Sequence, residues 1–168
     1  MEKKCCFTGH RPKSLPFGYN EEEPSCKKLK ELLSENIERQ ITENGVTHFI
    51  SGMAMGVDIY AAEAVLKLRE KYPQIKLECA IPCETQANKW SEGWRNRYFD
   101  IIRRSDVAKM LQTHYTPDCM MMRNKYMVDN SDVVIAVWNG LKSGTGNTVN
   151  YAVKSGKKVI IIDPNKLH

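Results

Sequence analysis

Two glycine-rich segments with neighbouring hydroxyl side chains stand out in this chain of 168 residues. They read Ser51-Gly52-Met53-Ala54-Met55-Gly56-Val57-Asp58 and Gly144-Thr145-Gly146-Asn147-Thr148. Glycines let a backbone turn sharply and come close to a ligand, and a helix that follows presents free amides and positive partial charge. The pattern is typical of a phosphate site, although a tight turn alone would also require such glycines. Neither segment contains the Gly-Lys-Ser or Gly-Lys-Thr of ATP-hydrolysing loops.

A third polar segment, Thr8-Gly9-His10-Arg11, closes the first apolar run of the chain. Arg11 could pair with a phosphate, and His10 could bind the ligand or transfer a proton. The alternative is a basic loop that is merely solvated. The segment is therefore a candidate for the same site as the two glycine-rich segments.

Single residues near these segments offer further chemistry. Asp58 lies where a helix should begin, and its carboxylate could hold ribose hydroxyls or simply complement the helix dipole. Glu84 is the carboxylate best placed to act as an acid or base after the third strand. Trp90 could stack on a base or pack in the core, and Arg123 with Asn124 could reach the cleft from the helix that carries them. If the chain is an enzyme, the catalytic candidates are Glu84, Asp58 and His10.

Strands and helices alternate along the chain, and this order determines where the segments lie. Strands are expected at 5–8, 47–50, 75–81, 107–111, 133–137 and 159–162. Helices are expected at 24–44, 58–72, 86–104, 118–129 and 149–155. The run Val133 to Val137 is apolar and β-branched throughout, which indicates a strand buried on both faces of a parallel sheet.

This alternation predicts a Rossmann-like, doubly wound, mainly parallel sheet with helices on both faces. Ligands of such sheets bind beyond the carboxyl ends of the strands, where the winding reverses. The candidate segments follow strands and should therefore meet at that edge.

Composition bounds the remaining possibilities. The length and the 42% hydrophobic content predict one domain over residues 1–168. The chain has no apolar run long enough to span a membrane and no signal peptide, so we expect a cytoplasmic protein. Its six cysteines include no Cys-x-x-Cys pair, which favours buried thiols over a metal site. The net charge of +5 favours an anionic ligand but lacks the basic stripe of a dedicated DNA binder.

Several motifs together resemble a known family. They are Cys6-Phe7-Thr8-Gly9-His10-Arg11-Pro12, the segment Ser51 to Asp58, Trp90, Met127-Val128-Asp129-x-Ser131-Asp132, and Gly144-Thr145-Gly146-x-Thr148 through Tyr151-Ala152. Their order over nearly the whole chain resembles the YpsA-like branch of the SLOG superfamily. The resemblance implies a fold shared with DprA/Smf proteins and LOG-type phosphoribohydrolases, and binding of nucleotides or nucleotide sugars. Because the LOG relatives assemble through helical faces, it also implies a homodimer.

The sequence departs from the hydrolases at one point. LOG proteins place glutamates directly after the second glycine-rich stretch, where this chain has Val149, Asn150 and Tyr151. An amide cannot replace a carboxylate as a base. Hydrolysis by the same arrangement is therefore not expected.

The leading hypothesis is a sensor or regulatory module for a nucleotide-like small molecule, with no other cofactor. The alternatives are a nucleotide N-glycosidase and a DprA-like binder of single-stranded DNA. The residues expected to contact the ligand are Thr8, Gly9, His10, Arg11, Ser51, Gly52, Met53, Gly56, Asp58, Trp90, Gly144, Thr145, Gly146, Asn147 and Thr148.

Overall fold

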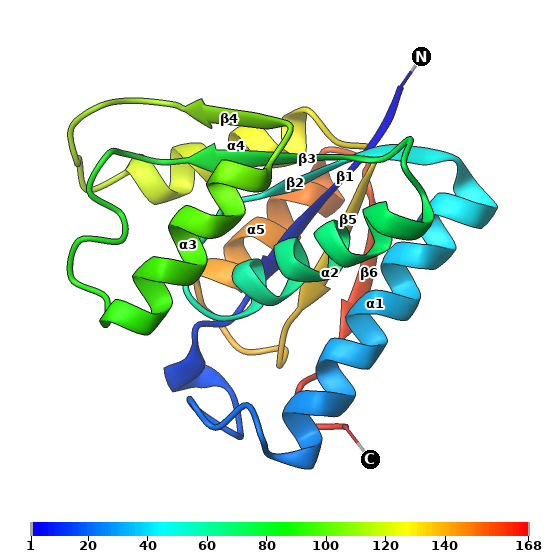
Figure 1. Ribbon diagram of the computed structural model, residues 1–168, viewed down its shortest axis with the longest axis horizontal. Helices are drawn as coiled ribbons and strands as arrows, with labels where there is room; N and C mark the ends of the chain where they lie inside the picture. The colour runs from blue at the N-terminus through cyan, green and yellow to red at the C-terminus, as the bar shows by residue number, and fades with distance from the viewer. Residues whose placement is uncertain (1, 168) are drawn as a thin grey trace.

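A six-stranded parallel sheet forms the centre of the computed structural model, which describes residues 2–167 (Figure 1). The strand order is β4-β3-β2-β1-β5-β6, and all neighbouring pairs are parallel. The strands are β1 (Lys3–Gly9), β2 (Val46–Ser51), β3 (Lys76–Ile81), β4 (Val107–Met110), β5 (Val133–Val137) and β6 (Lys158–Ile162).

Helices cover both faces of this sheet, as Figure 1 shows. They are α1 (Pro24–Asn44), α2 (Val57–Lys71), α3 (Glu92–Arg104), α4 (Cys119–Asp129) and α5 (Gly144–Lys154). The first three pack on one face, and α4 and α5 pack on the other. The predicted Rossmann-like, doubly wound fold is confirmed.

Alternation along the strands divides the core between the two faces. On β1, Cys5 and Phe7 belong to the larger core beneath α1 and α2, whereas Cys6 between them belongs to the smaller core beneath α4 and α5. Phe7 stacks on Phe49 of β2 with ring centroids 6.1 Å apart. β5 is buried along its whole length, as its apolar sequence predicts. All six cysteines are buried free thiols, in line with the prediction.

Two predicted helix boundaries are wrong. The helix expected from residue 86 begins at Glu92, because Ser91 occupies the N-cap position with extended backbone and the chain before it forms successive turns. Gln86 and Trp90 therefore do not share a helical face with Trp94. The segment Gly144 to Thr148, expected as a loop, forms the first turns of α5 behind the N-cap residue Ser143.

The winding of the sheet reverses between β1 and β5. β2, β3 and β4 lie on one side of β1 in chain order, while β5 and β6 lie on the other side. The loops after β1 and β5 therefore diverge at the carboxyl edge of the sheet, which leaves space there for a ligand. Within residues 2–167, no helix has both the length and the apolar character needed to cross a membrane.

Candidate functional site

A cavity of about 350 Å³ lies at this reversal point. Its wall comes from the loops after β1, β2 and β5 and from α4. The lining residues are Thr8, Gly9, His10, Arg11, Lys13, Ser14, Ala54, Asp58, Met120, Arg123, Asn124, Ser143, Gly144 and Thr145. Segments from both ends of the chain thus meet as the strand order predicts, and we call this space the switch-point cavity.

The loop after β1 packs directly on the start of α2, and two glycines make this contact possible. A Cβ atom at Gly9 would lie 2.4 Å from Val57, and one at Gly56 would lie 2.7 Å from the His10 carbonyl oxygen. Gly56 also has a φ of 99°, which favours glycine. These glycines bring the two loops together, and Gly9 also lines the cavity.

The segment Ser51 to Asp58 is held by its own hydrogen bonds. The Ser51 hydroxyl donates to the Asp58 carbonyl oxygen at 2.8 Å and accepts from the Met53 amide at 3.2 Å. The Ala54 amide donates to Asp58 Oδ2 at 3.2 Å. Met53 has a φ of 61°, an uncommon value for a residue other than glycine. The amides of Met53, Ala54 and Val57 are thus already engaged, the last of them by the His10 carbonyl oxygen of the loop after β1.

The start of α5 is more open. Ser143 caps the helix by accepting a hydrogen bond from the Gly146 amide at 3.1 Å. Gly144 and Thr145 line the cavity, and a Cβ atom at Gly144 would have no neighbour within 4 Å. The amide groups and positive dipole end of α5 therefore face the space that a phosphate could occupy.

Arg123 brings a buried positive charge to the cavity wall. Its guanidinium donates to the Gly52 carbonyl oxygen, to Gln86 Oε1 at 3.2 Å and to Asn124 Oδ1 at 2.8 Å. A Cβ atom at Gly52 would lie 2.7 Å from this guanidinium, so that glycine makes room for the arginine. Burial lowers the pKa of Arg123 from its ordinary high value.

The sequence leaves open whether Arg123 and Asn124 reach the cleft, and both line the cavity. A signal for Arg123 exists in the spacing of Cys119, Arg123 and Met127, which form one buried stripe of α4. A charged residue within an apolar helical stripe is unusual unless the charge has a function or a partner.

Asp58 faces Arg123 as a buried carboxylate without an ion pair. Its Oδ1 atom has no hydrogen-bond partner, and no cation among residues 2–167 lies within 4 Å of its oxygens. Burial raises the pKa of Asp58, while the charge of Arg123 and the Ala54 amide act in the opposite direction. The carboxylate is thus destabilised in its ionised form beside the cavity.

His10 is placed at the cavity as a neutral ring. It is 5% exposed, and its Nε2 accepts a hydrogen bond from the Asn139 amide at 3.1 Å. Burial lowers its pKa, outweighing the bond from Asn139. Since Nε2 is occupied as an acceptor, the ring links the loops after β1 and β5.

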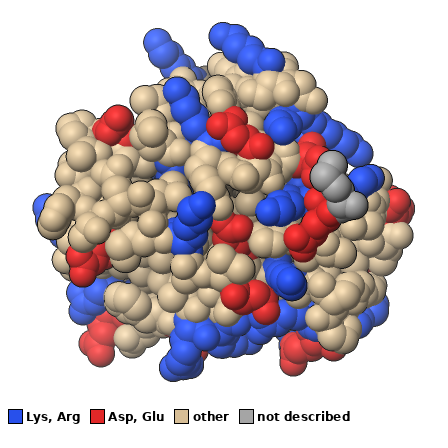
Figure 2. Space-filling view, turned by 90° about the horizontal axis from the view of Figure 1, so that it is seen from above, with Lys and Arg blue, Asp and Glu red and all other residues tan. Residues whose placement is uncertain are grey.

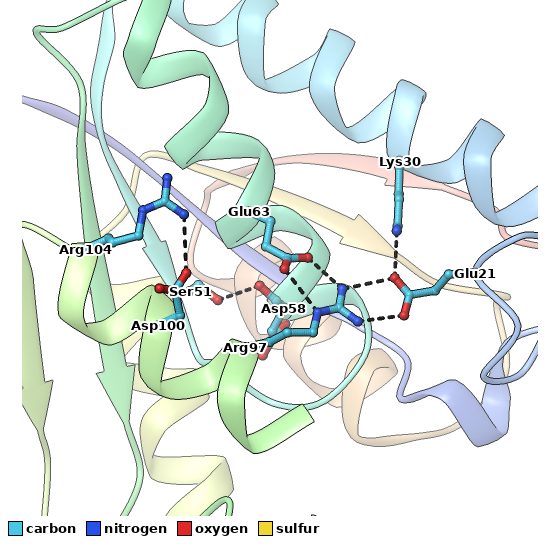
Figure 3. A network of polar contacts seen from close by, with 8 residues as sticks. All are labelled: Glu21, Lys30, Ser51, Asp58, Glu63, Arg97, Asp100 and Arg104. Atoms are coloured by element: carbon cyan, nitrogen blue, oxygen red, sulfur yellow. Dashed lines mark hydrogen bonds and ion pairs between the residues drawn. The ribbon is translucent and has the colours of Figure 1, made fainter. Parts of the chain in front are cut away.

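Arg11 and Lys13 complete the cationic side of the cavity. Both are exposed at its rim, and neither forms an ion pair with a residue between 2 and 167. The segment between these residues and α1 is held by a polar network, which Figure 3 shows. In this network Arg97 of α3 bridges Glu21 at 2.6 Å and Glu63 of α2 at 2.7 Å. Lys30 of α1 also binds Glu21, at 2.7 Å.

Some predicted residues lie away from the switch-point cavity. Glu84 is exposed and lines neither this cavity nor the one beside it. Trp90 packs edge-on against Tyr98, with ring centroids 5.2 Å apart, and also lines neither. Asn147 and Thr148 line an adjoining cavity of about 520 Å³ between α4 and α5, here called the α4–α5 cavity.

Comparisons with solved structures agree with this architecture. The chain resembles DNA processing protein A from Helicobacter pylori, described for its single-stranded DNA binding mode, with a TM-score of 0.62, 21% identity and coverage of 97% of this chain and 69% of the other. For DNA processing protein A of Streptococcus pneumoniae the TM-score is 0.61, with 18% identity and coverage of 95% and 50%. For TM1055, a structural-genomics target, it is 0.56, with 19% identity and coverage of 94% and 72%. These likenesses concern the fold.

Sequence relatives are more informative about family. The chain is 35% identical over 144 residues to the uncharacterized SPbeta prophage-derived protein YoqJ of Bacillus subtilis, covering 79% of this chain and 84% of YoqJ. It is 29% identical to a UPF0398 protein of Brevibacillus brevis, covering 86% and 77%. The model of the YpsA family, described as the YspA SLOG family, matches residues 5–167. The chain therefore belongs to the YspA SLOG family.

Proposed function

We propose that this protein binds a nucleotide or nucleotide-sugar ligand in the switch-point cavity and acts as a sensor or regulatory module. In this proposal the phosphate lies at the start of α5, between the Gly144 and Thr145 amides and the side chains of Arg11 and Lys13. Arg123 adds positive charge from below, and Asp58 accepts hydrogen bonds from sugar hydroxyls after a small rotation of its carboxylate.

The observation that carries the proposal is the imbalance of charge around the cavity. Arg11, Lys13 and Arg123 line it, and Asp58 is the carboxylate among the lining residues. Unpaired cations beside an open helix N-terminus are an arrangement that attracts an anion. Doubly wound sheets hold the pyrophosphate of dinucleotides at a helix N-terminus beside the point where the strand order reverses.

Arg11→Ala should weaken binding of adenosine monophosphate about tenfold, because it removes a charge-assisted hydrogen bond to the phosphate. Isothermal titration calorimetry measures the affinity. Arg39→Ala is the matched control, since Arg39 is an exposed arginine of α1 outside both cavities. Equal losses in the two variants would exclude a local role for Arg11.

Asp58→Asn should separate stability from binding. Because the folded protein raises the pKa of Asp58, ionisation costs stability above the unfolded pKa of about 3.9, and this cost disappears as the pH falls below the folded value. At pH 7 the amide should therefore raise the unfolding free energy by about 0.5–1 kcal/mol while weakening nucleotide binding. Thermal unfolding at pH 7 and calorimetry test both effects, and a less stable variant with unchanged affinity would contradict this role.

Two other functions make different predictions. A nucleotide N-glycosidase would release free base, and Asp58 is the carboxylate lining the cavity that could protonate a leaving group. A binder of single-stranded DNA would need a basic groove with exposed aromatic side chains. On the face that Figure 2 shows, basic side chains are instead scattered among acidic ones. Ligand binding in the cavity is the function that the geometry favours.

A further inference from the structure

The α4–α5 cavity adjoins the switch-point cavity and is the larger of the two. Its volume is about 520 Å³, against about 350 Å³. Met120, Asn124 and Gly144 line both cavities, so a ligand held at the start of α5 can extend from one into the other.

The walls of the α4–α5 cavity combine apolar surface with amide groups. Met120 and Met121 line it from α4, and Tyr151 lines it from α5. Asn147 and Asn150 add donors and acceptors from α5. Methionine and tyrosine beside amide side chains suit a flat heterocycle with a hydrogen-bonding edge, such as a nucleobase.

Two lysines give this second cavity a positive charge of its own. Lys125 and Lys154 line it, both are exposed, and neither forms an ion pair with any residue in the range 2–167. Lys125 lies over the Tyr151 ring, with its Nζ atom 5.6 Å from the ring centroid. The hydroxyl of Tyr151 donates to Asp129 at 2.6 Å, so that nearby carboxylate already has a partner.

Two cations on the opposite face of the sheet have counter-ions. Lys30 pairs with Glu21 at 2.7 Å, and Arg69 pairs with Asp106 at 2.8 Å. Cations without counter-ions thus line both adjoining cavities, which gives the combined space two places for an anion.

We infer that the ligand is a nucleoside flanked by two phosphate groups, one at the start of α5 and the other between Lys125 and Lys154. This inference rests on the proposed function and adds the second phosphate to it. The 11 residues of α5 span about 15 Å of helix axis. Lysine side chains on a helix lean towards its N-terminus, which brings the two anion sites closer than that length. A nucleoside bisphosphate and a 5′-phosphorylated dinucleotide share this chemistry.

The test compares adenosine monophosphate, adenosine 3′,5′-bisphosphate and 5′-phosphorylated diadenylate by calorimetry. Natural protein should bind at least one of the two-phosphate ligands about tenfold more tightly than the monophosphate. In Lys125→Gln/Lys154→Gln this advantage should fall below about twofold, with the affinity for the monophosphate unchanged. The control Lys67→Gln/Lys89→Gln removes the same charge at exposed positions that line neither cavity and should keep the advantage. The two-phosphate ligand that binds more tightly shows whether the protein recognises a nucleoside bisphosphate or a phosphorylated dinucleotide.

The inference is overturned if the three ligands bind natural protein equally, or if the advantage persists in Lys125→Gln/Lys154→Gln. The proposed function would survive both results. Absence of binding by all three ligands would overturn the proposed function, and this inference with it.

Discussion

The Gly56→Ala variant should unfold at a temperature about 6–12 °C below that of the natural chain. Gly56 has a φ of 99°, and an alanine Cβ atom there would lie 2.7 Å from the His10 carbonyl oxygen and 3.1 Å from the Arg11 Cα atom. Backbone strain and the overlap with backbone atoms each cost about 1–3 kcal/mol. A combined loss of about 3 kcal/mol corresponds to that temperature shift in a domain of this size.

The change at Gly56 should also weaken nucleotide binding, because the displaced atoms belong to the loop that carries His10 and Arg11. Gly140→Ala is the matched control for strain alone, since Gly140 has a φ of 84° and no atom within 4 Å of an added Cβ. It should cost about 1 kcal/mol. Equal destabilisation of the two variants in thermal unfolding would mean that the close contact of Gly56 with the loop after β1 contributes nothing to stability.

Glu78→Leu should lower the unfolding free energy by about 3 kcal/mol, through a buried polar cluster beneath α4. Glu78 is 4% exposed and binds His48 Nε2 at 2.7 Å and the Tyr126 hydroxyl at 2.6 Å. Leucine would leave both groups without their acceptor, and such losses inside proteins cost several kcal/mol. Denaturant unfolding measures the change, with Glu35→Leu on the exposed face of α1 as a control expected to stay within about 0.5 kcal/mol.

The same cluster predicts a dependence on pH. Burial acts to raise the pKa of Glu78, but the hydrogen bonds from His48 and Tyr126 outweigh it and leave the pKa below its ordinary value. A lowered carboxyl pKa stabilises the fold above the unfolded value of about 4.3, and this contribution is lost as the pH falls through the folded value. Glu78→Gln should therefore lose less stability than the natural chain on acidification below about pH 4.5. An identical acid response in both proteins would contradict this role of Glu78.

The regular elements of this fold could be predicted because their local patterns agree with their surroundings. The apolar run Val133 to Val137 indicates a strand buried on both faces, and that is where β5 lies. The start of α3 was predicted too early, because the four-residue spacing of Gln86, Trp90 and Trp94 continues through turns that end at Ser91. A regular spacing of side chains shows which residues face the core, and successive turns can produce the same spacing as a helix.

The candidate site was partly predictable, for reasons of geometry. Loops that follow parallel strands must meet at one edge, so the positions of Arg11, Asp58 and Gly144 followed from the strand order. The contribution of α4 to the cavity did not follow from the strand order, because the face that a helix turns towards a cavity depends on how the helix packs. From the sequence, Arg123 was therefore only one of the residues that could reach the cleft, and the α4–α5 cavity required the structure. The same holds for Gly9 and Gly56, whose neighbours lie in distant segments of the chain.

The most direct test of the central claim is calorimetric titration of the natural chain and of Gly144→Asp with nucleotides, dinucleotides and ADP-ribose derivatives. Gly144 faces open space, so aspartate fits there while its charge repels a phosphate; Gly144→Ala is the control. Each ligand is recovered afterwards for chromatography. We expect saturable binding of an intact ligand to the natural chain and to Gly144→Ala, weakened more than tenfold in Gly144→Asp. Undiminished binding by Gly144→Asp would contradict the site, recovery of free base would indicate a hydrolase, and salt-sensitive binding of single-stranded DNA alone would contradict the small-ligand account.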